Sequence, residues 1–169
     1  MTFNPSKVPT AGKIPQTVYS LLIHKAEFAT SQQGSPGIKL HVEIVAPEAV
    51  EENGLTYNTI GTKGIMGFWF TEKNMSNCVE ALAKLDIVSP DKEFATVEEY
   101  VRWAADELAT RVGYSFKSIV ASTQEAVLGA DRKPLVDRDG KPLLKSHRAD
   151  FAMFGTIGVM TEPGAPMPF

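Results

Sequence analysis

Two segments of the chain, 38–45 and 64–70, carry side chains suited to binding a flat, negatively charged ligand. In "IKLHVEIV" (38–45) apolar and polar residues alternate, so Lys39 and His41 are expected to point away from the apolar face. In "GIMGFWF" (64–70) Trp69 stands between two phenylalanines and is expected on the opposite face from them. Cations contact anionic groups and an exposed aromatic ring stacks on other flat rings. The alternative role for Trp69 is to cover a helix or the end of a barrel.

Three weaker candidates for the same chemistry lie on neighbouring segments. Tyr57 and Lys63 precede the aromatic stretch, and Lys117 points away from the apolar residues of "YSFKSIV". We expect Tyr57 to stack and the two lysines to contact anions.

A basic segment, residues 129–148, is predicted to project as a ribbon. Asp139-Gly140 is a strong tight-turn signal, and "RKPLV" and "GKPLL" resemble the two arms of the ribbon. Its cations would clamp a phosphate backbone, or would simply keep an exposed loop in solution. The cations of this segment are Arg132, Lys133, Arg138, Lys141, Lys145 and Arg148.

Recognisable catalytic and metal-binding patterns are missing from the sequence. It contains no G-x-x-x-x-G-K-[ST] phosphate loop, no nucleophile elbow and no calcium loop. The glycines of "GTKGIMG" are not followed by a helix, as a dinucleotide fingerprint would require. One cysteine, Cys78, and three scattered histidines do not make a zinc site. We therefore expect a protein that is not an enzyme and has neither a cofactor nor a metal.

The charge of the chain is unevenly distributed. The 169 residues have a net charge of −3, with 43% hydrophobic residues. Residues 1–39 and 111–149 carry balances of +3 and +4, whereas residues 40–110 carry −8 and residues 150–169 carry −2. Two basic flanks could form one anion footprint if the fold brings them together. No leader and no long apolar run is present, which predicts a cytoplasmic protein that does not enter a membrane.

The hydrophobic periodicity divides the chain into an arm, a domain and a tail. Residues 1–16, rich in proline, read as an extended N-terminal arm, and residues 161–169 as a flexible C-terminal tail. Between them, residues 17–160 contain period-two stretches on both sides of a helical insert, residues 74–112. The strands are expected at 17–28, 38–45, 55–70, 114–128 and 150–160.

This element order predicts a mainly β protein of the α+β class. Three strands, a helical insert and two further strands match the five-stranded Greek-key barrel of the oligonucleotide-binding (OB) fold, with helices between strands 3 and 4. A small β-sandwich is the alternative. In an OB barrel the binding groove crosses strands 2 and 3, where Lys39, His41 and Trp69 are expected.

The chain resembles the phage-encoded single-stranded DNA-binding proteins with an OB fold. The resemblance rests on "VYSLLIHKAEF", "QGSPGIKLHVEIVAP", "GFWF", the helical insert and the terminal "MPF". Bacterial single-stranded DNA-binding proteins end similarly in Pro-Phe, here Pro168-Phe169, and in that family the terminal residue docks on replication and repair enzymes through its ring and carboxylate. The tail here has only Glu162 in place of that family's acidic run.

The resemblance implies sequence-tolerant binding of single-stranded DNA in phage replication or recombination, in the cytoplasm of a bacterial host. Bases would stack on Trp69 and Tyr57, while cations would contact phosphates. The tail would recruit replication or repair proteins, and oligomers are compatible with the arm and the strand edges. The alternative is a phage structural or assembly protein with pairing arms.

Overall fold

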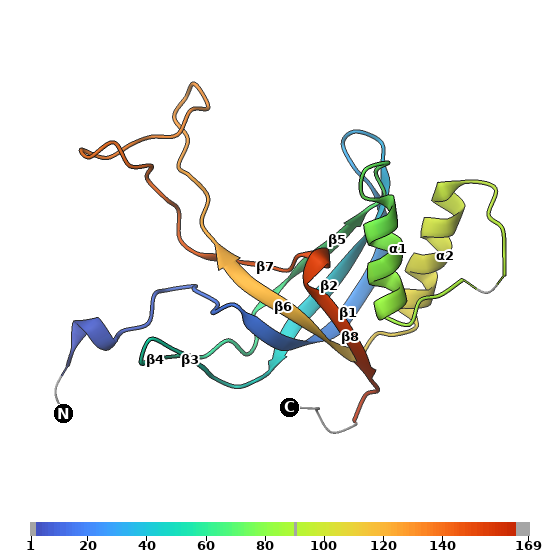
Figure 1. The fold of residues 1–169 in the computed structure, drawn as a ribbon, viewed down its shortest axis with the longest axis horizontal. Coiled ribbons are helices and arrows are strands. Elements are labelled where there is room, and N and C mark those ends of the chain that lie inside the picture. Colours follow the sequence, from blue (N-terminus) through green and yellow to red (C-terminus); the bar gives the residue numbers. More distant parts are fainter. Residues whose placement is uncertain (1–2, 90, 165–169) are drawn as a thin grey trace.

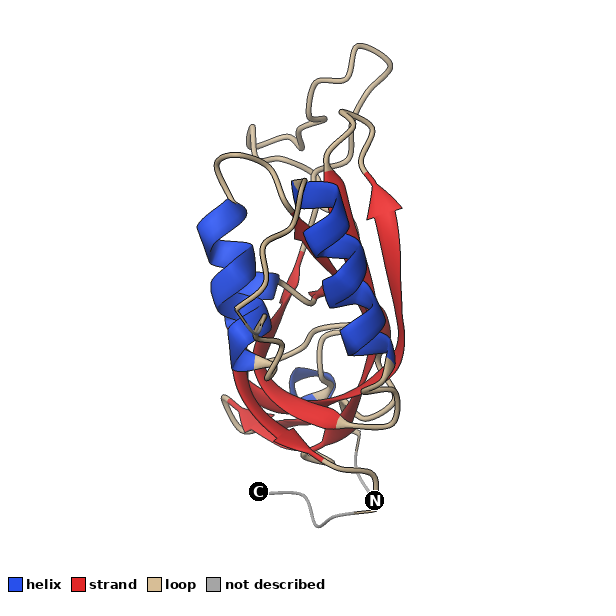
Figure 2. Cartoon of the chain, turned by 90° about the vertical axis from the view of Figure 1, so that its right-hand side faces the viewer, coloured by secondary structure: helices blue, strands red, loops and turns tan. Residues whose placement is uncertain are grey.

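An antiparallel sheet forms the body of the protein, and two helices cover one side of it (Figures 1 and 2). The computed structural model describes residues 3–89 and 91–164. The strands run in the order β5-β2-β1-β6-β7, and β8 also pairs with β6. Their bounds are β1 (Thr17–Thr30), β2 (Pro36–Ala46), β5 (Lys63–Trp69), β6 (Ser115–Thr123), β7 (Arg148–Asp150) and β8 (Thr156–Thr161).

The two helices lie between β5 and β6 in the chain, as the sequence predicts. Helix α1 (Met75–Lys84) and helix α2 (Val97–Ala109) pack their apolar stripes over the sheet. Thr96 caps the start of α2, because its hydroxyl accepts a hydrogen bond from the Glu99 amide at 3.1 Å, and the Glu99 carboxylate accepts from the Ala95 amide at 3.2 Å. The mainly β, α+β architecture is therefore confirmed.

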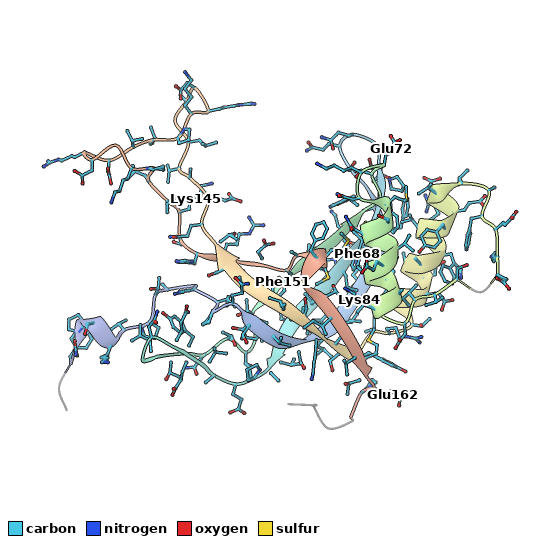
Figure 3. All side chains as sticks on the ribbon, viewed as in Figure 1. Phe68, Glu72, Lys84, Lys145, Phe151 and Glu162 are labelled. Atoms are coloured by element: carbon cyan, nitrogen blue, oxygen red, sulfur yellow. The ribbon has the colours of Figure 1, made fainter. Side chains whose placement is uncertain are left out.

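The sheet is not closed into the barrel that the sequence predicts. Among the described residues β5 pairs only with β2, and β8 pairs only with β6. The space between them holds the 3-10 turn η2 (Met153–Gly155) and the ring of Phe151, which lies against Gly64 of β5. Phe151 and Phe68 are both buried, and Figure 3 shows them near the centre of the molecule. Side-chain packing thus fills the gap where backbone pairing would close a barrel.

The predicted strand 55–70 is divided in two. Its first part pairs with the acidic segment before it, as the small hairpin of β3 (Val50–Glu52) and β4 (Leu55–Tyr57). Asn53 and Gly54 form the turn of this hairpin, both with positive φ. The chain then turns again at Gly61, whose φ is +88°, before β5 begins. Only the second part of the predicted strand therefore joins the main sheet.

The predicted basic ribbon folds as a three-fold knob (residues 125–145) that projects from the body (Figure 1). Three short segments, eight residues apart, bond to one another in a ring. The amide of Val127 donates to the Leu143 carbonyl at 2.8 Å, Leu135 donates to Val127 at 2.8 Å, and Leu143 donates to Leu135 at 2.9 Å. Isolated bridges repeat the same order between neighbouring segments: Leu128–Pro134, Val136–Pro142 and Leu144–Ala126.

The end of the N-terminal arm is fixed to the base of the knob. Ile14 is buried, and its amide donates to the Ser122 hydroxyl at 2.9 Å. That hydroxyl also lies 3.0 Å from Nδ1 of His147. The Tyr19 hydroxyl donates to the Pro15 carbonyl at 2.6 Å. The rest of the arm, which includes the 3-10 turn η1 (Pro5–Lys7), remains exposed.

Candidate nucleic-acid interface

One face of the sheet, here called the outer face, lies opposite the core side chains of β2 and β5. Its residues come from strand positions that alternate with Leu40, Met66 and Phe68, all fully buried. Register pairs them across the two strands as Gly37–Trp69, Lys39–Gly67, His41–Ile65 and Glu43–Lys63. The structure therefore brings four predicted site residues, Lys39, His41, Lys63 and Trp69, onto one surface.

Two glycines make a shelf on which the Trp69 ring lies. A Cβ atom added to Gly37 would lie 2.7 Å from Cζ3 of the indole, and one added to Gly67 would lie 2.7 Å from its Nε1. The ring therefore spans β2 and β5 in close contact with the backbone of both strands. It remains only half-buried, so part of the indole is accessible. Trp69 therefore does not cover a helix, which is one of the alternative roles considered from the sequence.

A bulge in β1 adds cations to the outer face. The register shifts between Ile23 and Lys25, so one extra residue, His24, interrupts the alternation. After the shift Lys25 and Glu27 pair with His41 and Lys39. The alternation of the sequence did not predict this change of face, because a bulge leaves no period of its own.

Two glutamates hold most of the cations of the outer face. Glu27 lies 2.9 Å from Lys25 and 3.1 Å from His41, whereas Glu43 lies 2.9 Å from His24. The hydrogen bonds from Lys25 and then His41 lower the pKa of the Glu27 carboxyl below its usual 4.5.

Two lysines complete the charge of the outer face. Lys63 lies 3.8 Å from Glu43 and its side chain is 70% exposed. Lys39 forms no ion pair within 4.0 Å in the described part of the chain. Three lysines (Lys25, Lys39 and Lys63) against the two glutamates (Glu27 and Glu43) leave a balance of +1 with neutral histidines.

A cleft leads from the outer face to the base of the knob. It has a volume of about 550 Å³ and lies between β5, at Lys63 and Ile65, and the knob's base, at Thr123 and Arg148. A second hollow of about 380 Å³ shares Lys63 and Ile65 and continues to His41. The two hollows meet at Lys63, Gly64 and Ile65 of β5.

The knob carries exposed cations whose neighbouring acids are engaged in turns. Asp131 accepts the Lys133 amide at 3.1 Å, and Asp137 accepts the amides of Asp139 and Lys141. Within residues 3–89 and 91–164, four knob cations form no ion pair: Arg132, Lys133, Arg138 and Lys141.

Tyr57 does not join this surface, and Lys117 lies far from its Trp69 end. Tyr57 is only 5% exposed and its ring is capped by Lys13, whose Nζ lies 5.6 Å from the ring centre, so it offers no stacking face. Lys117 of β6 pairs with Ser20 of β1, whereas Gly37, beside Trp69, pairs with Ala29 of β1. The nine residues from Ser20 to Ala29 span roughly 30 Å at the rise of a strand. The predicted docking pair Pro168-Phe169 lies outside the described residues.

The comparisons with known proteins add no relative. No protein-family model matches the chain, and no curated protein matches its sequence. In the described residues no group of histidine, cysteine and acidic side chains is arranged to hold a metal ion. No helix of the described chain has the length and apolar character needed to cross a membrane.

Proposed function

We propose that the protein binds single-stranded DNA across the outer face, with little sequence preference, in support of phage replication or recombination. The observation that carries this proposal is the Trp69 indole on its glycine shelf, beside Lys39. Every base has a flat face that stacks on an aromatic ring, so such a site tolerates any sequence. Phosphates would follow the cleft past Lys63 toward the cations of the knob.

The strand order supports an open form of the OB arrangement. The order β5-β2-β1-β6-β8, with helices between β5 and β6, is that of an OB barrel before its first and last edges meet. In such a fold β2 and β5 provide the binding face, and the long connection between β6 and β8 is one of the loops beside it. In the proposed OB arrangement, the outer face would be the binding face and the knob would be part of the loop beside it.

The decisive experiment is a fluorescence titration with oligo-dT at several salt concentrations. The chain has only two tryptophans, Trp69 and Trp103, so each can be observed alone. Trp103 packs against Tyr100, with ring centres 6.0 Å apart, and is the internal control. We expect Trp103→Phe to keep the quenching of fluorescence and the affinity, whereas Trp69→Phe loses most of the quenching.

The salt dependence distinguishes this proposal from its alternative. Affinity should fall linearly on a logarithmic scale as salt rises, because phosphate contacts release counterions. Absence of binding at low salt would contradict the proposal. Closed particles without nucleic acid would favour the structural or assembly protein instead.

The C-terminal tail is proposed to recruit replication or repair proteins through Pro168-Phe169. A chain truncated after Glu162 should bind oligo-dT as the full chain does but should no longer capture such partners. Loss of oligo-dT binding on truncation would instead place the tail in the DNA site.

A further inference from the structure

The three-fold knob exposes more apolar surface than a phosphate clamp can use. Five aliphatic side chains on it are between 41% and 58% exposed: Leu128, Leu135, Val136, Leu143 and Leu144. Contacts to phosphates need only cations and hydrogen-bond donors. A cluster of exposed aliphatic groups bordered by charges is the usual composition of a protein-binding surface.

The hydrogen-bonded ring makes this surface suitable for docking. Val127, Leu135 and Leu143 each donate to and accept from another segment, so the three segments hold one another in place. The bonds Lys145 to Glu125 at 2.8 Å and Asp137 to Lys141 at 2.9 Å fix the neighbouring positions. A surface that is ordered beforehand loses little conformational entropy when it binds.

The helices carry an apolar groove, here called the helical groove, whereas the apolar surface of the knob projects. It has a volume of about 410 Å³ and lies between α1, the segment after it, and α2. Val88, at 67%, and Val79, at 43%, are exposed beside it. The lining residues are Val79, Ala83, Ile87, Val88, Ser89 and Tyr100.

The charges around the two surfaces are complementary. The sequence range 86–107, which supplies Ile87, Val88, Ser89 and Tyr100 to the helical groove, contains seven acidic and two basic residues, a balance of −5. Residues 125–145 contain five basic and four acidic residues, and three of these acids lie in the knob's turns. The fourth, Glu125, pairs with Lys145 at 3.7 Å. Within the described residues, the other four cations of the knob are exposed and form no ion pair.

The knob and the helices lie on opposite sides of the molecule along its long axis (Figure 1), and Figure 3 shows Lys145 at the base of the knob and Lys84 on α1. A knob therefore does not reach the groove of its own chain. We propose that the knob of one copy docks in the helical groove of a second copy. Because the two surfaces differ, each added copy leaves one knob and one groove free, and the contact repeats head to tail.

Sedimentation velocity on nuclease-treated protein, over a wide concentration range, tests this contact without nucleic acid. We expect the average mass to rise past that of a dimer and not to level off there. A knob variant, Val136→Gln with Leu144→Gln, and a groove variant, Val79→Gln with Val88→Gln, should both remain monomers. All four side chains are exposed, so the fold should persist, which a thermal melt verifies.

Mixing the two variants gives the sharpest result. The knob variant keeps an intact groove and the groove variant keeps an intact knob, so the mixture should form one-to-one dimers and nothing larger. A control variant, Ile119→Gln with Ile157→Gln, changes two equally exposed aliphatic residues on β6 and β8 and should assemble normally.

Three results would overturn the contact: a wild-type protein that stays monomeric at every concentration, a mixture that forms no dimer, or a control variant that dissociates as the others do. Each of these would leave the oligo-dT titration unaffected, because that experiment uses dilute protein and reads Trp69.

Discussion

At the scale of single residues, the position of Trp69 depends on what its neighbours lack. Gly37 and Gly67 have no Cβ, and this lets the indole lie against both strands. The alternation of the sequence predicts Trp69 on the exposed face, but it does not predict the shelf that the two glycines form. Gly67 accepts the indole and Gly64 accepts Phe151, but no local pattern identifies which ring approaches which glycine.

Gly67→Ala should weaken DNA binding by displacing the ring. The new Cβ would meet only the Trp69 side chain, at 2.7 Å from Nε1, so the indole has to tilt away from the shelf. Loss of one stacked base costs about 1–3 kcal/mol, or at least a several-fold loss of affinity for oligo-dT. In a double-mutant cycle Gly67→Ala should have no further effect once Trp69→Ala is present. An independent, additive effect would show that the shelf does not act through Trp69.

Glu27→Gln should strengthen DNA binding. The Glu27 carboxylate holds Lys25 at 2.9 Å and His41 at 3.1 Å, and therefore competes with phosphate for both. Glu98→Gln, which removes a carboxylate paired with Arg102 on α2, is the matched control and should leave the affinity unchanged. Equal effects of both substitutions on oligo-dT affinity would mean that only net charge matters.

The same carboxylate gives a prediction on stability. The pKa of Glu27 is lower in the folded protein than its usual 4.5, so its ion pairs stabilise the fold above that value. This stabilisation is lost as the pH falls through the lowered pKa. Denaturation of wild type and Glu27→Gln should therefore show a difference in stability at neutral pH that disappears in acid.

At the scale of elements, the hydrophobic periodicity identifies single strands and helices, but it does not identify features that depend on contacts between segments. The clean alternation of residues 38–45 became β2, and the helical insert expected at 74–112 contains α1 and α2. The long strand expected at 55–70 failed because the hairpin turn at Gly54 captures its first part. The sequence shows two Pro-Leu pairs eight residues apart, which lie in two of the three segments of the knob. The third segment, residues 126–128, has no proline, and the sequence predicts it as the end of the strand 114–128.

Tyr19→Phe tests how the arm is attached to β1. The Tyr19 hydroxyl donates to the Pro15 carbonyl at 2.6 Å, so its removal should cost about 1 kcal/mol of unfolding free energy at neutral pH. Burial raises the pKa of Tyr19 from 10.0 to about 12, so the wild type keeps this stabilisation below 10 and loses it as the pH rises toward 12. Denaturation curves should show the two proteins converging over that range. A constant difference at all pH values would contradict this role.

At the scale of the whole molecule, the fold joins two basic segments that are far apart in sequence. Gly12 of the arm lies against the His147 carbonyl, and Ile14 bonds to Ser122, so the flanks with balances of +3 and +4 meet at the base of the knob. Composition showed that these flanks exist, and the fold brings them together. The open edge between β5 and β8 could not be predicted, because Phe151 and η2 fill it through contacts that no local pattern encodes.

The knob should contribute to the salt dependence of DNA binding. Each phosphate contact on a single strand adds about 0.7 to the slope of log affinity against log salt. Arg138→Gln with Lys141→Gln should therefore reduce the slope by up to about 1.4. The matched variant Lys84→Gln with Lys92→Gln, on α1 and on the segment between the two helices, should leave the slope unchanged. An unchanged slope in the first variant would remove the knob from the DNA path.

The ring of bonds in the knob also makes that segment a self-contained cassette. The chain enters at Glu125 and leaves at Lys145, and the Lys145 amide donates to the Glu125 carbonyl at 2.8 Å. Because the two ends are already neighbours, a short turn could replace residues 126–144 without moving β6 or β7. The same closed geometry would let the twenty-one residues be grafted onto the hairpin of an unrelated scaffold.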